Sequence, residues 1–192
     1  MRNLGVLTGF LPLIVFGLLS GNTPQSTQIA LLAAAIVSLL VGYQRLKRGF
    51  YLDWANILMF AGALFCFSVL NIPAVADYMR IVIYFVLMLV AFGSLIAGVP
   101  FTLQYARDMV DKSRWDNPAF QSVNRFMTGV WGGIFLLNLI LVTYSKIGVG
   151  SAARAAGLLV WGFLIIGIIF TMLYPEYLRK KLPFDAPPGM TP

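Results

Sequence analysis

Apolar residues along this chain gather in six long stretches, and polar or charged residues separate them. The stretches run from about residue 4 to 20, 28 to 44, 54 to 71, 80 to 99, 124 to 144 and 153 to 174. A helix rises ~1.5 Å per residue and needs about 20 apolar residues to cross the ~30 Å hydrocarbon core of a bilayer. The pattern therefore predicts an all-α fold, a polytopic transmembrane helical bundle of six spans.

The first stretch is the weakest of the six. Thr8, Gly9 and Pro12 interrupt it, and proline lacks the N–H that a helix interior needs. We therefore expect a helix that is short, kinked or re-entrant, with the backbone opened near Thr8. The alternative is a cleaved signal peptide with Arg2 as its positive start, although the residues around Ser20 make a poor cleavage pattern. Without this crossing, five full spans remain.

Composition leaves little room for a separate soluble domain. Apolar residues make up 59% of the chain and charged residues 11%, against ~25% charged in a typical soluble domain. We expect one integral membrane domain over residues 1–192. Within it, the sizeable extramembrane parts are a cytoplasmic loop over 100–123 and a cytoplasmic tail over 175–192.

Lysines and arginines fall mainly on one side of this six-span topology, which holds 11 of the 14. That side carries Arg2, Arg45, Lys47, Arg48, Arg107, Lys112, Arg114, Arg125, Arg179, Lys180 and Lys181, and the other side carries Arg80, Lys146 and Arg154. The positive-inside rule places both termini in the cytoplasm, and the carboxyl terminus there even with five spans. The partners expected from the charge are the lipid bilayer and anionic headgroups at the cytoplasmic face, not nucleic acid.

The loop after the fourth span contains an amphipathic segment. Phe101, Tyr105 and Met109 recur at i, i+4 and i+8, which predicts a helix lying in the membrane interface with these side chains toward the lipid. The simpler interpretation of the loop is a connector that orients two spans. The sharper hypothesis is a pocket for an anionic headgroup or a partner protein, formed by Gln104, Arg107, Arg114 and Asn124.

The fifth span has the clearest start and the most interior polar residues. Pro118 suits the first position of a helix, and Asp116 or Asn117 would cap it. Thr128 and Asn138 fall inside the span. They form either hydrogen bonds between helices or an intramembrane polar site that faces a ligand.

Residue types needed for most membrane enzymes are missing or scattered. The chain has no histidine and one cysteine, Cys66, inside the third span, which excludes histidine-ligated haem, histidine general bases and an intramolecular disulfide. The carboxylates lie near span ends, not in pairs at mid-membrane where a proton relay would place them. We expect no catalytic, cofactor-binding or metal-binding residues.

Small residues four apart predict close helix contacts. This spacing lets two backbones approach in lipid, and it leaves open whether the contact is internal or a homo-oligomer seam. The pairs are Gly5 with Gly9, Gly129 with Gly133, and Ala153 with Gly157.

Several segments together resemble the intracellular septation protein A family, the bacterial inner-membrane YciB group. The resemblance rests on Phe10-Leu11-Pro12-Leu13-Ile14-Val15-Phe16, on Tyr43-Gln44-Arg45-Leu46-Lys47-Arg48, on Ile83-Tyr84, and on Asn124, Trp131, Phe135 and Asn138. It implies a small protein of the bacterial inner membrane, associated with cell-envelope maintenance and septation. It also implies action through other membrane proteins and supplies no catalytic residues.

Three functional classes follow from the sequence. The leading one is a non-enzymatic inner-membrane protein of the cell envelope or septation, favoured by the missing catalytic groups and by the resemblance. A transporter or channel for a small solute or ion is second, with a polar path near Asn138. An intramembrane enzyme or lipid-handling protein is third, because the remaining reactive side chains form no recognisable motif.

Overall fold

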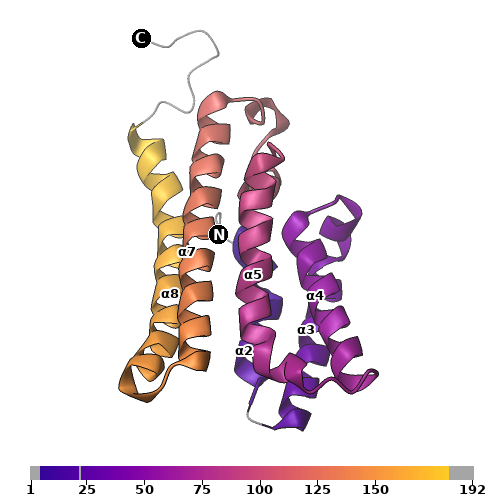
Figure 1. The fold of residues 1–192 in the computed structure, drawn as a ribbon. Helices are drawn as coiled ribbons and strands as arrows, with labels where there is room; N and C mark the ends of the chain where they lie inside the picture. The colour runs from indigo at the N-terminus through magenta and orange to yellow at the C-terminus, as the bar shows by residue number, and fades with distance from the viewer. Residues whose placement is uncertain (1–4, 22, 182–192) are drawn as a thin grey trace.

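The structure is a computed structural model that describes residues 5–21 and 23–181, and within this part it contains helices and no strands (Figure 1). The helices in chain order are α1 (Gly5–Gly9), α2 (Leu11–Leu19), α3 (Pro24–Lys47), α4 (Tyr51–Ser68), α5 (Ala74–Ile96), α6 (Phe101–Arg107), the short 3₁₀ helix η1 (Lys112–Arg114), α7 (Pro118–Ile147) and α8 (Gly150–Lys181).

Five of the described helices are long and apolar enough to cross a membrane. They are α3, α4, α5, α7 and the part of α8 from Gly150 to Tyr174, and each coincides with one of the last five stretches expected from hydropathy. Five helices of this length and composition fit a multi-pass helical membrane protein. Six spans are not confirmed, because the first stretch forms no helix of this kind.

The first stretch is broken at Phe10. Helices α1 and α2 are five and nine residues long, and the backbone turns between them, with the Phe10 N–H donating to the Leu7 carbonyl at 3.1 Å. Pro12 lies in the first turn of α2, where a missing N–H removes no helical hydrogen bond. The expected kink is thus present, and it lies just before the proline.

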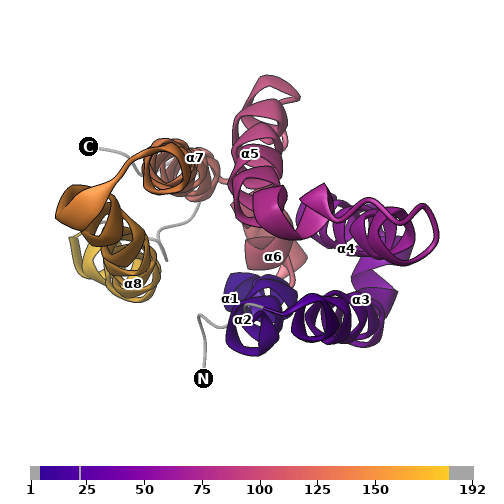
Figure 2. The same ribbon diagram turned by 60° about the horizontal axis from the view of Figure 1, so that its bottom comes forward.

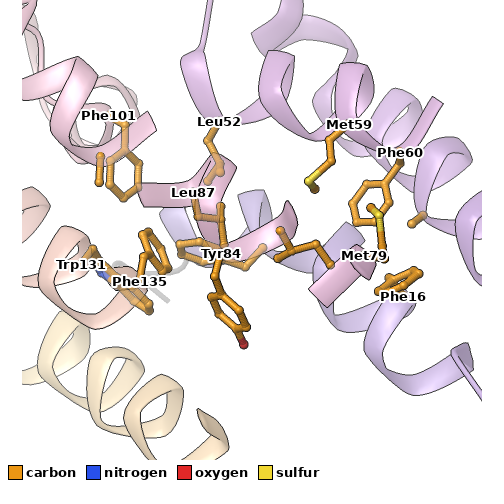
Figure 3. Close-up of a cluster of buried hydrophobic side chains, with 14 of the residues drawn as sticks. Phe16, Leu52, Met59, Phe60, Met79, Tyr84, Leu87, Phe101, Trp131 and Phe135 are labelled. Carbon is orange, nitrogen blue, oxygen red and sulfur yellow. The ribbon is translucent and has the colours of Figure 1, made fainter. Parts of the chain in front are cut away.

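The bundle is a curved row of helices when viewed along its length (Figure 2). Consecutive contacts run from α2 to α3, α4, α5, α7 and α8, while α6 packs against α7 and α1 at one end. Aromatic side chains fill the interior (Figure 3): Phe10, at the break, lies 4.8 Å from Trp131 between ring centroids, and Trp131 lies 5.3 Å from Phe135. The broken helix is therefore anchored in the core by the residue at its break.

Helix α6 differs from the expected interfacial helix. It ends at Arg107, so Met109 lies beyond it, and Phe101 and Tyr105 are only 0% and 2% exposed. The expectation that these side chains face lipid is wrong, because the apolar side of α6 is buried against the protein.

The start of α7 confirms the predicted cap, whereas the end of α8 lies further along the chain than expected. The Asn117 side chain accepts hydrogen bonds from the N–H groups of Ala119 and Phe120, which makes it the cap of a helix that begins at Pro118. Helix α8 continues past Tyr174 to Lys181, so the expected tail over 175–192 begins as helix. Its remaining residues, and Arg2, lie outside the described residues.

Among the described residues, the expected close contact at Gly129 and Gly133 is not present. A Cβ atom added at either glycine would meet no other atom within 4 Å. The close approach occurs instead at Gly132, where an added Cβ would lie 3.4 Å from the Cβ of Ala91 on α5. Gly132 is on the side of α7 that faces α5, one residue away from the spacing that the sequence suggested.

Candidate functional site

A buried ion pair connects the end of α3 to the start of α4. The Arg45 Nε and Nη2 atoms lie 3.0 and 3.1 Å from the two carboxylate oxygens of Asp53, a bidentate geometry that strengthens such a pair. The side chains of Arg45 and Asp53 are 15% and 4% exposed. Gly49 makes the intervening turn with a φ of 74°, a left-handed conformation that glycine adopts without strain.

Two hydroxyl groups extend this pair into a cluster. The Tyr105 hydroxyl on α6 donates to Asp53 Oδ2 at 2.6 Å, and Arg45 Nη1 donates to Thr8 Oγ1 on α1 at 3.2 Å. Helices α1, α3, α4 and α6 therefore meet at one carboxylate and one guanidinium. Together with Asn56, these residues form the Arg45–Asp53 cluster, which comprises Thr8, Arg45, Asp53, Asn56 and Tyr105.

Asn56 brings the break of the first stretch into the cluster. It follows Asp53 by one turn on α4, and its Nδ2 donates to the Gly9 carbonyl at 2.8 Å. A side-chain amide thus satisfies a backbone group at the point where the helix is interrupted, the arrangement that makes a broken helix tolerable in a membrane protein. The Asn56 Oδ1 atom is buried without a partner.

Two glycines make space for the cluster. A Cβ atom at Gly9 would lie 2.6 Å from the Tyr105 hydroxyl oxygen, and one at Gly42 would lie 2.9 Å from Asp53 Oδ1. Both distances are too short for real contacts. The close approach of α1 to α6 therefore depends on glycine at position 9, and that of α3 to α4 on glycine at position 42.

Electrostatics keep Tyr105 in its protonated form. Burial raises the pKa of Tyr105, and the negative charge of Asp53 and the hydrogen bond to it raise the pKa further. Deprotonation would place a second negative charge beside the carboxylate in a poorly solvated site. Tyr105 is therefore a fixed hydrogen-bond donor.

The loop that carries α6 is clamped onto the turn between α3 and α4. Arg48 Nη2 lies 2.7 Å from Asp108 Oδ2, and the hydrogen bond to Asp108 raises the pKa of Arg48. Gln104 accepts from the Tyr51 N–H at 3.0 Å and donates to the Gly49 carbonyl at 3.2 Å. These contacts bring two basic loops to the same end of the bundle.

Three of the four residues of the expected headgroup pocket have separate neighbours. Gln104 bonds the α3–α4 turn as described, and the Arg107 guanidinium lies 5.3 Å from the centre of the Trp115 ring. Asn124 is 4% exposed and donates to the Phe120 carbonyl one turn back on α7 at 2.8 Å. Arg114 is exposed on η1. The structure does not bring Gln104, Arg107 and Asn124 together around one space through these contacts.

The two intramembrane residues lie in different surroundings. The Thr128 and Thr102 hydroxyls share a hydrogen bond of 2.7 Å, and Thr102 also donates to the Asn124 carbonyl at 2.8 Å, so Thr128 joins α7 to α6. Asn138 is 0% exposed, and both polar atoms of its side chain lack a partner. Thr128 is therefore a contact between helices, whereas Asn138 retains unused hydrogen-bonding capacity.

Sequence patterns missed the Arg45–Asp53 cluster. Arg45 counted only as a membrane-flanking cation and Asp53 only as a helix-end carboxylate, because hydropathy treats each charge by itself. The available signal was an acid and a base on either side of a short turn with a glycine. Tyr105, in a loop far along the sequence, gave no such signal.

The bonding of the Arg45–Asp53 cluster is suited to holding helices together, as a structural brace does. The Asp53 carboxylate is already engaged by Arg45 and Tyr105, so it offers no free base or nucleophile. Within residues 5–21 and 23–181, no three His, Cys, Asp or Glu side chains gather where they could hold a metal ion. Comparison with protein-family models, with curated proteins and with solved structures finds no match to this chain.

Proposed function

We propose that the chain is a non-enzymatic protein of the bacterial inner membrane, which acts in cell-envelope maintenance or septation through partner membrane proteins. The observation that carries this proposal is the closed bonding of the Arg45–Asp53 cluster. Its two charged groups, on α3 and α4, bond each other and the hydroxyls of α1 and α6. Such a cluster fixes the shape of one end of the bundle, and a fixed surface suits recognition.

The proposed orientation places that end in the cytoplasm. The α3–α4 turn and the α6 loop lie together, and with them most of the basic residues, whereas the Lys146–Asp77 pair marks the opposite end. The positive-inside rule then assigns the basic end to the cytoplasm. In this topology α1 and α2 form a short, broken sixth crossing, and both chain ends are cytoplasmic.

The proposed contact surface is the exposed part of the α6–α7 connection. Lys112 and Arg114 are exposed on η1, and Asp111 and Asp116 on either side of them are exposed as well. The two cations suit anionic headgroups and the acidic surfaces of partner proteins.

Site-specific photocrosslinking in membranes of a bacterial host that encodes this chain tests the proposal. A photoreactive residue at Lys112 should capture cell-wall or division proteins reproducibly, identified by mass spectrometry. The same residue at Val149, which is 89% exposed at the opposite end, is the matched control. Capture of the same proteins from both positions, or of no envelope protein from Lys112, would contradict the proposal.

A second candidate function is transport of a small solute or ion, favoured by Asn138. A fully buried amide with two unpartnered atoms is costly, at about 1–3 kcal/mol for each group left unsatisfied, and a bound solute would remove that cost. Flux into proteoliposomes containing the purified protein tests it. Flux equal to that of protein-free vesicles for a panel of small anions, cations and neutral solutes would exclude this function.

A further inference from the structure

A groove with a volume of about 490 Å³ runs along the bundle between α4 and α5. Leu58 and Val82 at its rim are 66% and 40% exposed, whereas Met59 and Met79 in its floor are 9% and 1% exposed. Figure 3 shows the two methionines among the buried side chains of the core. Both helices are long and apolar enough to cross a membrane, so the groove opens toward lipid.

The lining of this groove is apolar. Of the described residues that line it, none carries a charge, a hydroxyl or an amide in its side chain, and the Cys66 thiol is the most polar group. A polar solute or a headgroup would lose its hydration there with hardly any hydrogen bond in return. Methionine side chains in the floor adapt to irregular apolar shapes. The chemistry that suits the groove is therefore hydrocarbon.

The groove has about the length of a hydrocarbon chain within one leaflet. On α4 it extends from Ala55 to Cys66, and on α5 from Val86 to Val75, which is eleven residues along each helix. At ~1.5 Å per residue this length is ~16 Å, close to half of the ~30 Å hydrocarbon core. Cys66 lies two residues before the end of α4 at Ser68. One end of the groove is therefore near the membrane surface opposite the basic loops.

The width of the groove suits one chain and not a helix. A volume of about 490 Å³ over a length of ~16 Å gives a mean cross-section of ~30 Å². A helix with its side chains is ~10–12 Å wide and needs roughly 80 Å² or more. A hydrocarbon chain packed at a carbon–carbon separation of ~4 Å needs roughly 20 Å². A helix from a second copy of this protein is thus too wide to enter, whereas a single acyl chain fits.

Gly62 keeps the middle of the groove open. An added Cβ at this position would meet no other atom within 4 Å, so no neighbouring side chain closes the space. In lipid, association depends on van der Waals packing because the surroundings are equally apolar. A chain in the groove gains such contacts from two helices, and a chain on the convex surface gains them from one. The groove should therefore hold a chain more firmly than the rest of the surface does.

We propose that this space, the α4–α5 groove, holds one acyl chain of a membrane phospholipid. The chain enters from the end of the bundle opposite the basic loops, and the headgroup stays at the surface beside the connection over residues 69–73. The site lies apart from the contact surface proposed on the α6–α7 connection, and it requires no partner protein.

Photocrosslinking with a modified phospholipid tests the site. The protein is reconstituted into vesicles of phosphatidylethanolamine and phosphatidylglycerol with a trace of phosphatidylethanolamine that carries a diazirine on one acyl chain. After irradiation, mass spectrometry maps the crosslinked residues. Met59, although buried, should be crosslinked more than Leu158 on α8, which is 74% exposed. Gly62→Leu should lower the yield at Met59 at least about threefold, because the leucine side chain occupies the groove.

Gly129→Leu is the matched control. Gly129 is also a helical glycine at which an added Cβ would meet no atom within 4 Å, but it lies on α7, outside the groove. This variant should leave the yield at Met59 unchanged. Val82→Phe fills the groove from α5 and should act as Gly62→Leu does, so the test does not depend on one variant folding. Gel filtration in detergent checks the fold of each variant.

Native mass spectrometry distinguishes the possible occupants of the groove. The wild-type protein should retain one phospholipid in detergent, and Gly62→Leu should lose it while Gly129→Leu keeps it. Crosslinking at Met59 that is no stronger than at Leu158, or that neither groove-filling variant lowers, would overturn the acyl-chain site. A dimer that Gly62→Leu separates would also overturn it, because the groove would then be a seam between two copies. Each of these outcomes leaves the photocrosslinking from Lys112 to envelope proteins unaffected.

Discussion

The ion pair of the Arg45–Asp53 cluster and the amide of Asn138 are both buried, but only the ion pair has its hydrogen-bonding groups satisfied. Asp53 receives hydrogen bonds from Arg45 and Tyr105, whereas neither side-chain atom of Asn138 has a partner. Satisfied groups hold four helices in place. Unsatisfied groups cost free energy unless water or a solute supplies the missing bonds. The contrast separates the part of the molecule that gives it shape from the part able to bind.

The largest effect is expected from Asp53→Asn. This change leaves the Arg45 guanidinium without a counter-charge in a nearly buried position, which typically costs about 3–5 kcal/mol. Equilibrium unfolding in detergent micelles measures the loss. The double variant Arg45→Met with Asp53→Leu should recover most of it, because no unpaired charge remains. A loss below about 1 kcal/mol for Asp53→Asn would show that the pair does not brace the bundle.

Tyr105→Phe should cost less, about 1.5–3 kcal/mol, because it removes one hydrogen bond to a charged group and leaves the ion pair intact. The pKa of Tyr105 is raised in the folded protein, so the folded state holds the phenol proton more tightly than the unfolded chain. This stabilisation is complete below pH 10 and declines as the pH rises above 10. The stability difference between wild type and Tyr105→Phe should therefore shrink in alkaline buffer.

Unfolding measured at pH 7 and at pH 10.5 checks this pH dependence. Tyr43→Phe is the control, because Tyr43 is 57% exposed and lies outside the cluster. A difference between wild type and Tyr105→Phe that stays constant across this range would show that the pKa of Tyr105 is not raised in the folded protein.

Asn138→Leu should have the opposite sign. Leucine has a similar size and removes two unpartnered polar atoms, so without bound solute the protein should gain about 1 kcal/mol in the free energy of unfolding. A loss of stability would show that Asn138 has a permanent partner, such as an ordered water molecule, and that it belongs to the architecture.

Hydropathy was sufficient for the long helices, because burial in lipid depends on the composition of a stretch and hardly on its neighbours. It located α3, α4, α5, α7 and the apolar part of α8 to within a few residues. It also signalled the interruption of the first stretch, since Pro12 acts through local geometry. The predicted cap at Asn117 is equally local.

The sites depended on partners that no local pattern contains. Tyr105 shares a helical face with Phe101, and the periodicity identified that face as apolar; it could not tell whether lipid or protein would cover it. Arg45 and Asp53 each look like a typical charge at a helix end. Their pairing depends on the tertiary structure, in which α1 and α6 pack against them. Asn138 was recognised from its depth alone, because an amide inside a span is unusual in any arrangement.

The smallest effect is expected from Asp77→Asn, which breaks the exposed Lys146–Asp77 ion pair at the opposite end of the bundle from the Arg45–Asp53 cluster. Lys146 and Asp77 are 39% and 65% exposed, and exposed pairs contribute about 0–1 kcal/mol, less as salt is added. Equilibrium unfolding at low and high salt measures the loss in the free energy of unfolding, with Asp53→Asn measured alongside. Both substitutions replace an aspartate that pairs with a cation, and the two pairs differ in burial. Equal losses would show that burial does not set the two pairs apart.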